Sequence, residues 1–155
     1  MAFYYPPTGF LFQVSFDDSL YKTYEGKEDA GFQEVTGLTT EIGMEEYREG
    51  GENRFAHRLP NPVTYSNIVL KRGLLQGSAM FAWYKKSVES FEFTTYDLNI
   101  ILLNENREPL QAWNVVSAYP VKWEVSGLNA MDAQVVVDAV ELRFQYFRQI
   151  NFENE

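Results

Sequence analysis

Hydrophobic and polar residues alternate along much of the chain, which is the pattern of β-strands with one buried face. The alternation is regular in residues 10–16, 121–125 and 139–146, where Phe, Val, Trp, Leu or Tyr occupies every second position. Residues 65–71 and 98–103 are more continuously apolar, as in strands that are covered on both faces. These segments predict a fold built mainly from antiparallel strands.

A further strand is predicted over residues 32–42, which contain Thr and Val. Gly37 within this segment indicates a bulge or a close approach of two backbones. Together the segments amount to six or seven strands. In the last one, Asp138 is in phase with the apolar positions Val136 and Val140. Because a buried carboxylate requires hydrogen bonds or a cation, we expect Asp138 at the start of this strand and near solvent.

One segment has the periodicity of a helix instead. After Ser78, the apolar residues Met80, Trp83, Tyr84 and Val88 recur at i, i+3, i+4 and i+8. Ser78 is a suitable N-cap. About three turns of helix are marginal alone in water, so this helix must pack on the sheet. We therefore predict a mainly β fold: a small antiparallel β-barrel or sandwich with one flanking helix and a long protruding charged hairpin.

Two polar segments lie between the predicted strands. Residues 17–31 are polar and acidic and predict a surface excursion. Residues 41–59 contain five Glu and three Arg, and Gly50 and Gly51 at their centre indicate the tip of a hairpin. Such a hairpin cannot bury itself, and its mixed charges suit pairing with another chain. The alternative is a solvated loop.

Composition narrows the class of protein further. The length of 155 residues and the hydrophobic content of 45% indicate one globular domain over residues 1–155. The net charge of −9 argues against specific nucleic-acid binding and against binding to an anionic membrane surface. The absence of cysteine excludes disulfides, thiolate nucleophiles and cysteine-based zinc sites. A single histidine, His57, argues against multi-histidine metal sites and catalytic triads.

No motif for a cofactor or a catalytic centre occurs in the sequence. Phosphate-binding glycine loops, zincin helices and EF-hand loops are all missing. Glu45 and Glu46 are adjacent, and adjacent residues on a strand point to opposite faces, so the two carboxylates do not converge on one bond. We therefore expect no enzymatic activity, no cofactor and no metal site.

The sequence also predicts how the chain relates to membranes. Residues 1–10 lack the basic region and the continuous apolar run of a signal peptide. No stretch approaches the ~20 apolar residues that a membrane-spanning helix requires. We expect synthesis in the cytoplasm and no membrane insertion by this chain alone.

Several short motifs follow one another in a specific order. They are FQEVTGL at residues 32–38 followed by Glu41, YREGGEN at 47–53, LP at 59–60, IVLKRG at 68–73, Trp83, WNV at 113–115 and YPVKW at 119–123. This order resembles the tail-tube proteins of contractile phage tails and the inner-tube proteins of phage-tail-like contractile injection systems, over about residues 10–147. The motif residues of the family are Gly37, Leu38, Leu59, Pro60, Leu70, Lys71, Arg72, Gly73, Trp83, Trp113, Pro120 and Trp123.

The resemblance implies a structural protein without catalysis. Members of this family form hexameric rings that stack into a hollow tube inside a contractile sheath, so the implied partners are further copies of the chain, the sheath protein, baseplate or hub proteins, cap proteins and possible cargo in the lumen. The charged hairpin would be the arm that contacts the next ring. The residues expected to make this contact are Glu45, Glu46, Tyr47, Arg48, Glu49, Gly50, Gly51, Glu52, Asn53, Arg54 and Arg58.

Two other functions stay open. The first is a tube-like protein of the same fold placed next to the baseplate or at the cap. The second is a β-barrel that binds a small ligand, although six or seven strands with bulky Phe and Trp side chains leave little room inside.

Overall fold

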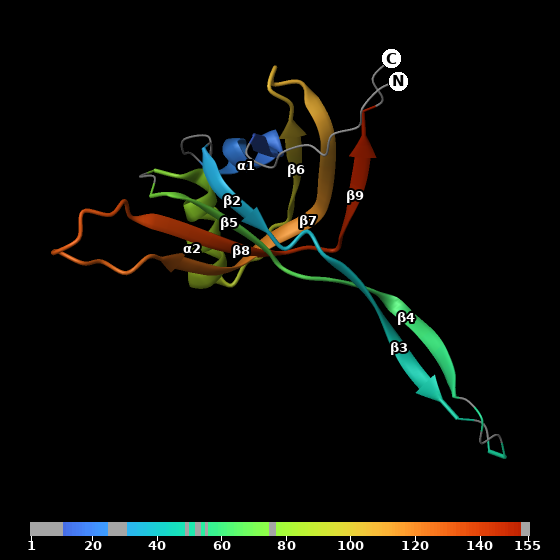
Figure 1. Cartoon of the computed structure of the whole chain (residues 1–155). Helices are drawn as coiled ribbons and strands as arrows, with labels where there is room; N and C mark the ends of the chain where they lie inside the picture. The colour runs from blue at the N-terminus through green and yellow to red at the C-terminus, as the bar shows by residue number, and fades with distance from the viewer. Residues whose placement is uncertain are drawn as a thin grey trace.

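The computed structural model describes residues 11–24, 31–48, 50–51, 54, 56–74 and 77–152. Its elements, in chain order, are β1 (Phe12–Phe16), α1 (Asp18–Thr23), β2 (Phe32–Thr36), β3 (Thr40–Tyr47), β4 (His57–Tyr65), β5 (Ile68–Gly73), α2 (Ala79–Ser90), β6 (Tyr96–Leu103), β7 (Pro109–Val125), β8 (Val137–Arg143) and β9 (Tyr146–Asn151). Figure 1 shows these elements in one view. The prediction of a mainly β fold is confirmed, with a second short helix that the sequence did not indicate.

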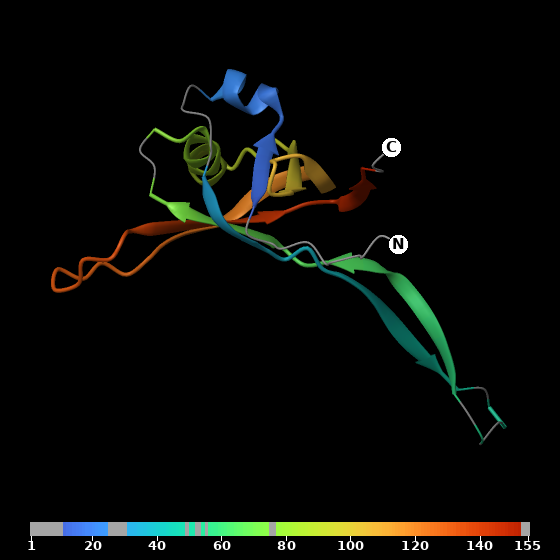
Figure 2. The ribbon, with the colours of Figure 1, turned by 45° about the horizontal axis from the view of Figure 1, so that its top comes forward.

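All strand pairs are antiparallel, and the long strand β7 belongs to two layers. One layer has the order β1-β6-β7-β9 and the other has the order β2-β5-β8-β7. The first layer uses the N-terminal half of β7, and the second uses residues 119–125. Among the described residues, strands β3 and β4 pair only with each other, and they leave the body as a hairpin (Figure 2).

The strand that we predicted over residues 139–146 is interrupted at Phe144 and Gln145. The part before the break pairs with β5 and with the second half of β7, and the part after it pairs with the first half of β7. At Ser117, where β7 passes between the layers, φ is +55°. Because β7 changes direction there, a single neighbouring strand cannot pair with both of its halves. At the break between β8 and β9, Gln145 N donates to Val116 O at 3.0 Å.

The core lies between the two layers and helix α2. Trp83 on α2 is fully buried, and its ring makes edge contacts with Phe16 and Tyr96. Its Nε1 donates to Thr94 O at 2.8 Å, which satisfies the polar atom of this buried side chain. The predicted cap is confirmed, because Ser78 Oγ accepts a hydrogen bond at the start of α2. No helix in the described ranges is long and apolar enough to cross a membrane.

Helix α1 corrects the expectation that residues 17–31 form only a surface excursion. The Asp17 carboxylate accepts a hydrogen bond from Ser19 N at 2.9 Å, and this bond caps α1 and lowers the pKa of Asp17. Leu20 and Tyr24 turn inward and join the core. Burial raises the pKa of the Tyr24 phenol. The segment therefore contributes to the core, because its few apolar residues recur at helical spacing.

The structure tests the sequence predictions for Gly37 and Asp138. Gly37 has φ of +97°, and a Cβ there would lie 2.0 Å from Asn67 O, so the predicted close approach of two backbones is confirmed. Asp138 does lie near the start of its strand, but it is buried and not near solvent. Its Oδ1 lies 3.4 Å from Nε of the equally buried Arg72, which supplies the required cation.

Candidate assembly surfaces

The most prominent surface feature is the arm, which consists of β3, β4 and the turn between them (residues 40–65). The arm continues the β2–β5 ladder outward and projects away from the body in both ribbon views (Figures 1 and 2). The predicted glycine tip lies in its turn, where Gly51 has φ of +97°. Of the predicted contact residues, Glu49, Glu52 and Asn53 lie outside the described residues.

Strand register divides the side chains of the arm between two faces. On one face Ile42 lies opposite Val63, and Met44 lies opposite Pro60. Side chains on neighbouring positions of a strand point to opposite faces, so Glu45 belongs to the other face. The first face of the arm is therefore apolar from Ile42 to Met44, and the pair of Glu46 and Arg58 follows on it toward the tip. We call this apolar part the apolar arm face, and its members are Ile42, Met44, Pro60 and Val63.

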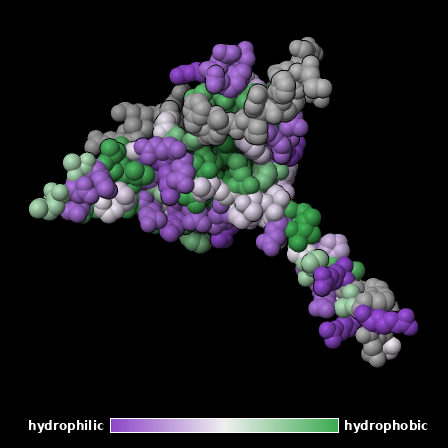
Figure 3. All heavy atoms as spheres, in the orientation of Figure 1, coloured by the Kyte–Doolittle hydropathy of each residue, from purple (hydrophilic) through white to green (hydrophobic). Residues whose placement is uncertain are grey.

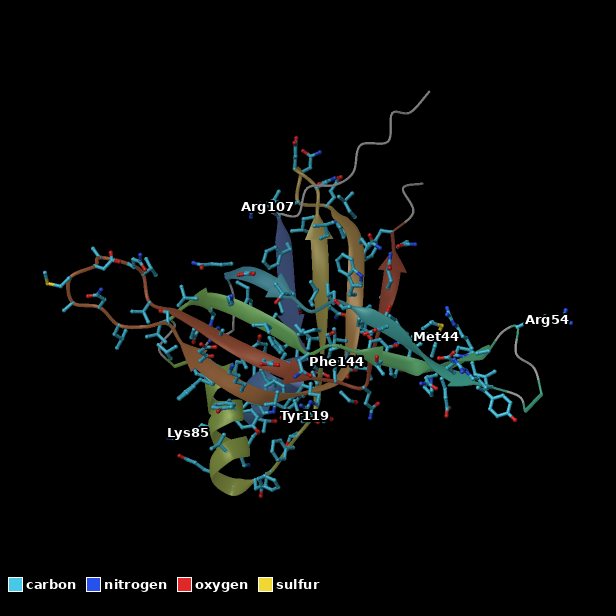
Figure 4. The ribbon with its side chains drawn as sticks, turned by 60° about the horizontal axis from the view of Figure 1, so that its bottom comes forward. Met44, Arg54, Lys85, Arg107, Tyr119 and Phe144 are labelled. Carbon is cyan, nitrogen blue, oxygen red and sulfur yellow. The ribbon has the colours of Figure 1, made fainter. Side chains whose placement is uncertain are left out.

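The apolar arm face is open to solvent in a single copy of the chain. Ile42 is 59% exposed and Met44 is 64% exposed. At the base of the arm the apolar surface continues into Tyr65, whose ring centroid lies 5.6 Å from that of Phe144 and 5.3 Å from that of Phe147. Figure 4 shows Phe144 at the body and Met44 further out along the arm. In Figure 3 apolar and polar residues both appear along the arm.

The charged residues of the arm lie mainly toward its tip. Arg48 Nη2 is 3.9 Å from Glu46 Oε1, and both side chains are exposed. Arg58 lies opposite Glu46 in the strand register, and Arg54 lies near the turn (Figure 4). Exposed ion pairs of this kind contribute about 0–1 kcal/mol. The predicted charged residues are therefore gathered on the arm, but the apolar face is the feature that the sequence interpretation missed.

A second surface is the outer face of the layer formed by β2, β5, β8 and residues 119–125, which we call the four-stranded layer. Acidic and basic side chains alternate on it: Lys71 Nζ is 3.4 Å from Glu34, and Lys122 Nζ is 3.6 Å from Glu124. Asn67 Nδ2 donates to Glu141 at 2.8 Å. This face is thus polar, with its charges largely compensated. No group of three or more acidic or histidine side chains in the described part of the chain could hold a metal ion.

The two outer strands of this layer have free edges. In the described residues β2 pairs only with β5, and residues 119–125 pair only with β8. Free strand edges carry unpaired backbone N–H and C=O groups, so they can pair with another chain.

Seven of the twelve motif residues serve the interior. Leu70, Arg72, Trp83 and Pro120 are fully buried. Leu38, Trp113 and Trp123 pack against the core. The motif residues other than the four fully buried ones lie in three places: Gly37 and Leu38 at the β2–β3 junction, Leu59 and Pro60 on the arm, and Lys71, Gly73, Trp113 and Trp123 on the strands of the body. The motif order therefore largely reflects the fold, whereas Leu59 and Pro60 lie on the exposed arm, as do Tyr47 and Arg48 of the YREGGEN motif.

Comparisons with known proteins agree with this geometry. The family model of the T4-like virus tail tube protein gp19 matches residues 8–148. A search of the curated proteins finds no match.

Three solved structures show the likeness in detail. A chain of the anti-feeding prophage (AFP) baseplate, symmetrised six-fold, is 27% identical with a TM-score of 0.77, and the alignment covers 97% of this chain and 98% of that chain. A chain of the extended PVC sheath-tube complex, an extracellular contractile injection system, is 26% identical with a TM-score of 0.78, covering 96% and 93%. A chain of the AFP tube-terminating cap is 25% identical with a TM-score of 0.80, covering 98% and 95%.

Proposed function

The chain belongs to the family of the T4-like virus tail tube protein gp19, and on this premise we propose that it is a structural subunit of the inner tube of a contractile particle. The particle is a contractile phage tail or a phage-tail-like contractile injection system. The observation that carries the proposal is the family match over residues 8–148, supported by the likeness to chains of the PVC sheath-tube complex. In this role the chain acts as a single domain over residues 1–155, without catalysis and without a cofactor.

The four-stranded layer supports assembly into a ring. Its four strands alternate in direction. The two edge strands, β2 and residues 119–125, therefore run in opposite directions. Copies related by rotation can therefore join β2 of one copy to residues 119–125 of the next in an antiparallel manner. Such a head-to-tail contact closes into a ring of six, and the six-fold symmetrised baseplate structure contains a chain of similar fold.

The arm supports the stacking of one ring on the next. A two-stranded hairpin is marginal in water by itself, and the body of its own chain leaves the arm uncovered. In a stack of rings, the arm would lie against a copy in the adjacent ring. Its contact residues there are Glu45, Glu46, Tyr47, Arg48, Glu49, Gly50, Gly51, Glu52, Asn53, Arg54 and Arg58.

The proposed partners follow from this placement. A sheath protein surrounds the tube, baseplate or hub proteins and cap proteins bind its ends, and cargo can occupy the lumen. Contraction of the sheath then drives the rigid tube through a target envelope, and no covalent bond changes in this chain. We expect the chain to be made in the cytoplasm and to work as part of the particle.

Electron microscopy of the purified protein tests the proposal. At high concentration we expect rings and hollow tubes. Arg48→Glu and Gly50→Pro are expected to leave the subunit folded and to reduce tube formation, because both changes fall on the tip of the arm. A protein that stays monomeric at every concentration would contradict the tube assignment, and normal tubes from both variants would contradict the role of the arm.

A second candidate is a tube-like protein at one end of the particle. The chains from the AFP baseplate and the AFP cap are as similar to this chain as the chain of the sheath-tube complex is. The number of copies per particle separates the two roles, since the main tube contains many rings and a terminal protein contributes only one or a few. Quantitative mass spectrometry of the purified particle measures this number.

A further inference from the structure

Two exposed apolar surfaces lie at opposite ends of the four-stranded layer, and neither belongs to the arm. The first is a groove beside the C-terminal half of α2, and the second is the loop that connects β7 to β8, residues 126–136, which we call the tip loop. Strand β8 runs from one to the other, beginning at Val137 and ending at Arg143. Seven residues of strand span roughly 20 Å. A single copy therefore cannot place its tip loop in its own groove.

The α2 groove has an aromatic wall. It has a volume of about 670 Å³ and lies between α2, residues 91–93 and β7, and Tyr119 marks its position in Figure 4. Phe91 is 81% exposed and has φ of +52°, a conformation that costs energy for a bulky residue. Its ring contacts Phe93, and Phe93 in turn contacts Tyr119. Arg143 lies on the wall and has no ion-pair partner among the residues that the structure describes.

The tip loop presents large apolar side chains to solvent. Met131 is 94% exposed, and Leu128 and Val135 are also well exposed. The loop is held by its own hydrogen bonds: Met131 N donates to Asn129 Oδ1 at 3.0 Å, and Asp132 N donates to Asn129 O at 3.2 Å. In both ribbon views the loop lies on the side of the body away from the arm (Figures 1 and 2).

The two surfaces match in chemistry. Methionine sulfur makes favourable contacts with aromatic rings, which suits Met131 against Phe91 and Phe93. Asp132 stands beside Met131 and, like Arg143, has no ion-pair partner in the described part of the chain. On α2 itself the lysines are already paired with acids, Lys85 with Glu89 and Lys86 with Glu92. Arg143 is thus the cation of the groove that can pair with an acidic side chain of another copy.

We propose that the tip loop of one copy docks in the α2 groove of a copy in the adjacent ring, with Met131 against the aromatic wall and Asp132 paired with Arg143. This inference rests on the proposed tube function. Each subunit would offer its tip loop at one end and its groove at the opposite end. A contact of this kind repeats from copy to copy without closing into a ring, as a stack of rings requires. It would act beside the arm, because the groove and the base of the arm lie at the same end of β8.

Cysteine cross-linking tests this contact, because the chain contains no cysteine of its own. The probe is the full-length variant with Met131→Cys and Val88→Cys, where Val88 is an exposed residue of the groove. The control carries Met131→Cys and Glu89→Cys, since Glu89 is the next residue on α2 and points about 100° away from Val88. After mild oxidation of assembled tubes, we expect the first variant to give a ladder of covalent multimers and the control to stay mainly monomeric.

An exchange of the two charges provides a second test of the docking. Asp132→Arg and Arg143→Asp each place like charges together, and we expect each to raise the protein concentration required for tubes by about tenfold, with recovery in the double variant. Normal tubes without a ladder, or a double variant no better than the single ones, would overturn the docking while leaving the tube function intact. Wild-type protein that forms no tubes would overturn both.

Discussion

At the scale of single residues, Arg72 joins three parts of the fold. Its Nε faces Asp138 on β8, its Nη2 donates to Ser78 Oγ at 2.7 Å, and its guanidinium lies 5.4 Å from the centroid of the Phe32 ring. Ser78 also caps α2 by accepting a hydrogen bond from Phe81 N. A buried charge needs such partners, because its desolvation is costly. This explains why an arginine can occupy the fully buried position in the motif at residues 68–73.

Removing one partner of this buried pair should destabilise the subunit strongly. Asp138→Ala leaves the Arg72 charge buried without its carboxylate, and we expect a loss of about 3–5 kcal/mol in the free energy of unfolding. The double variant Arg72→Met with Asp138→Ala removes both charges and should recover most of this loss. Urea unfolding of the unassembled subunit measures both values. A change below about 1 kcal/mol for Asp138→Ala would contradict the assigned role of the pair.

At the scale of elements, the arm combines two kinds of surface. Its outer part carries most of the charges that the sequence predicted, and its middle part carries the apolar arm face. Burial of that face in an assembly would contribute roughly 25 cal/mol for each Å² of apolar surface removed from water. Exposed ion pairs contribute less. We therefore expect the apolar face to supply most of the stacking energy of the arm and the charges to supply its orientation.

Two substitutions on adjacent residues separate these contributions. Met44→Lys and Glu45→Gln each change the net charge by +1, but they lie on opposite faces of β3. Met44→Lys should raise the concentration required for tubes by about tenfold or more, because it places a charge in an apolar contact. Glu45→Gln should change it by less than about threefold. Sedimentation at a series of concentrations measures both, and equal effects would contradict the division into faces.

At the scale of the whole molecule, net charge and apolar surfaces act in opposite directions. Each subunit carries a formal charge of −9, so copies repel one another at long range. The exposed apolar residues of the arm, the groove and the tip loop favour association. Assembly should therefore depend on salt, which screens repulsion but leaves apolar contacts largely intact.

We expect tubes to form more readily as salt increases. Between about 0.01 M and 0.15 M salt the screening length falls from about 30 Å to about 8 Å, which reduces repulsion between copies. Light scattering during a salt titration measures the extent of assembly. Dissociation of tubes over this range would mean that ion pairs of the arm, and not its apolar face, hold the rings together.

Some local features were predictable from the sequence alone. Alternating or continuous runs of apolar residues identified β1, β5, β6, β8 and the end of β7, and helical spacing after Ser78 identified α2. Gly37 and Gly51 marked positions of positive φ. These features depend on the nearest neighbours in the chain, through side-chain direction and the backbone angles that a residue tolerates. The family resemblance was also detectable, because the motif order reflects the fold.

Other features required the tertiary structure. Whether Asp138 is buried depends on Arg72, which lies 66 residues away in the chain. The break between β8 and β9 depends on the course of β7, a different strand. The apolar arm face exists only because the register between β3 and β4 sets Ile42 opposite Val63. The sequence by itself thus indicated helix α2 and the strands β1, β5, β6 and β8. The pairing of distant strands decided where strands break and which side chains share a surface, since that depends on contacts that no local pattern encodes.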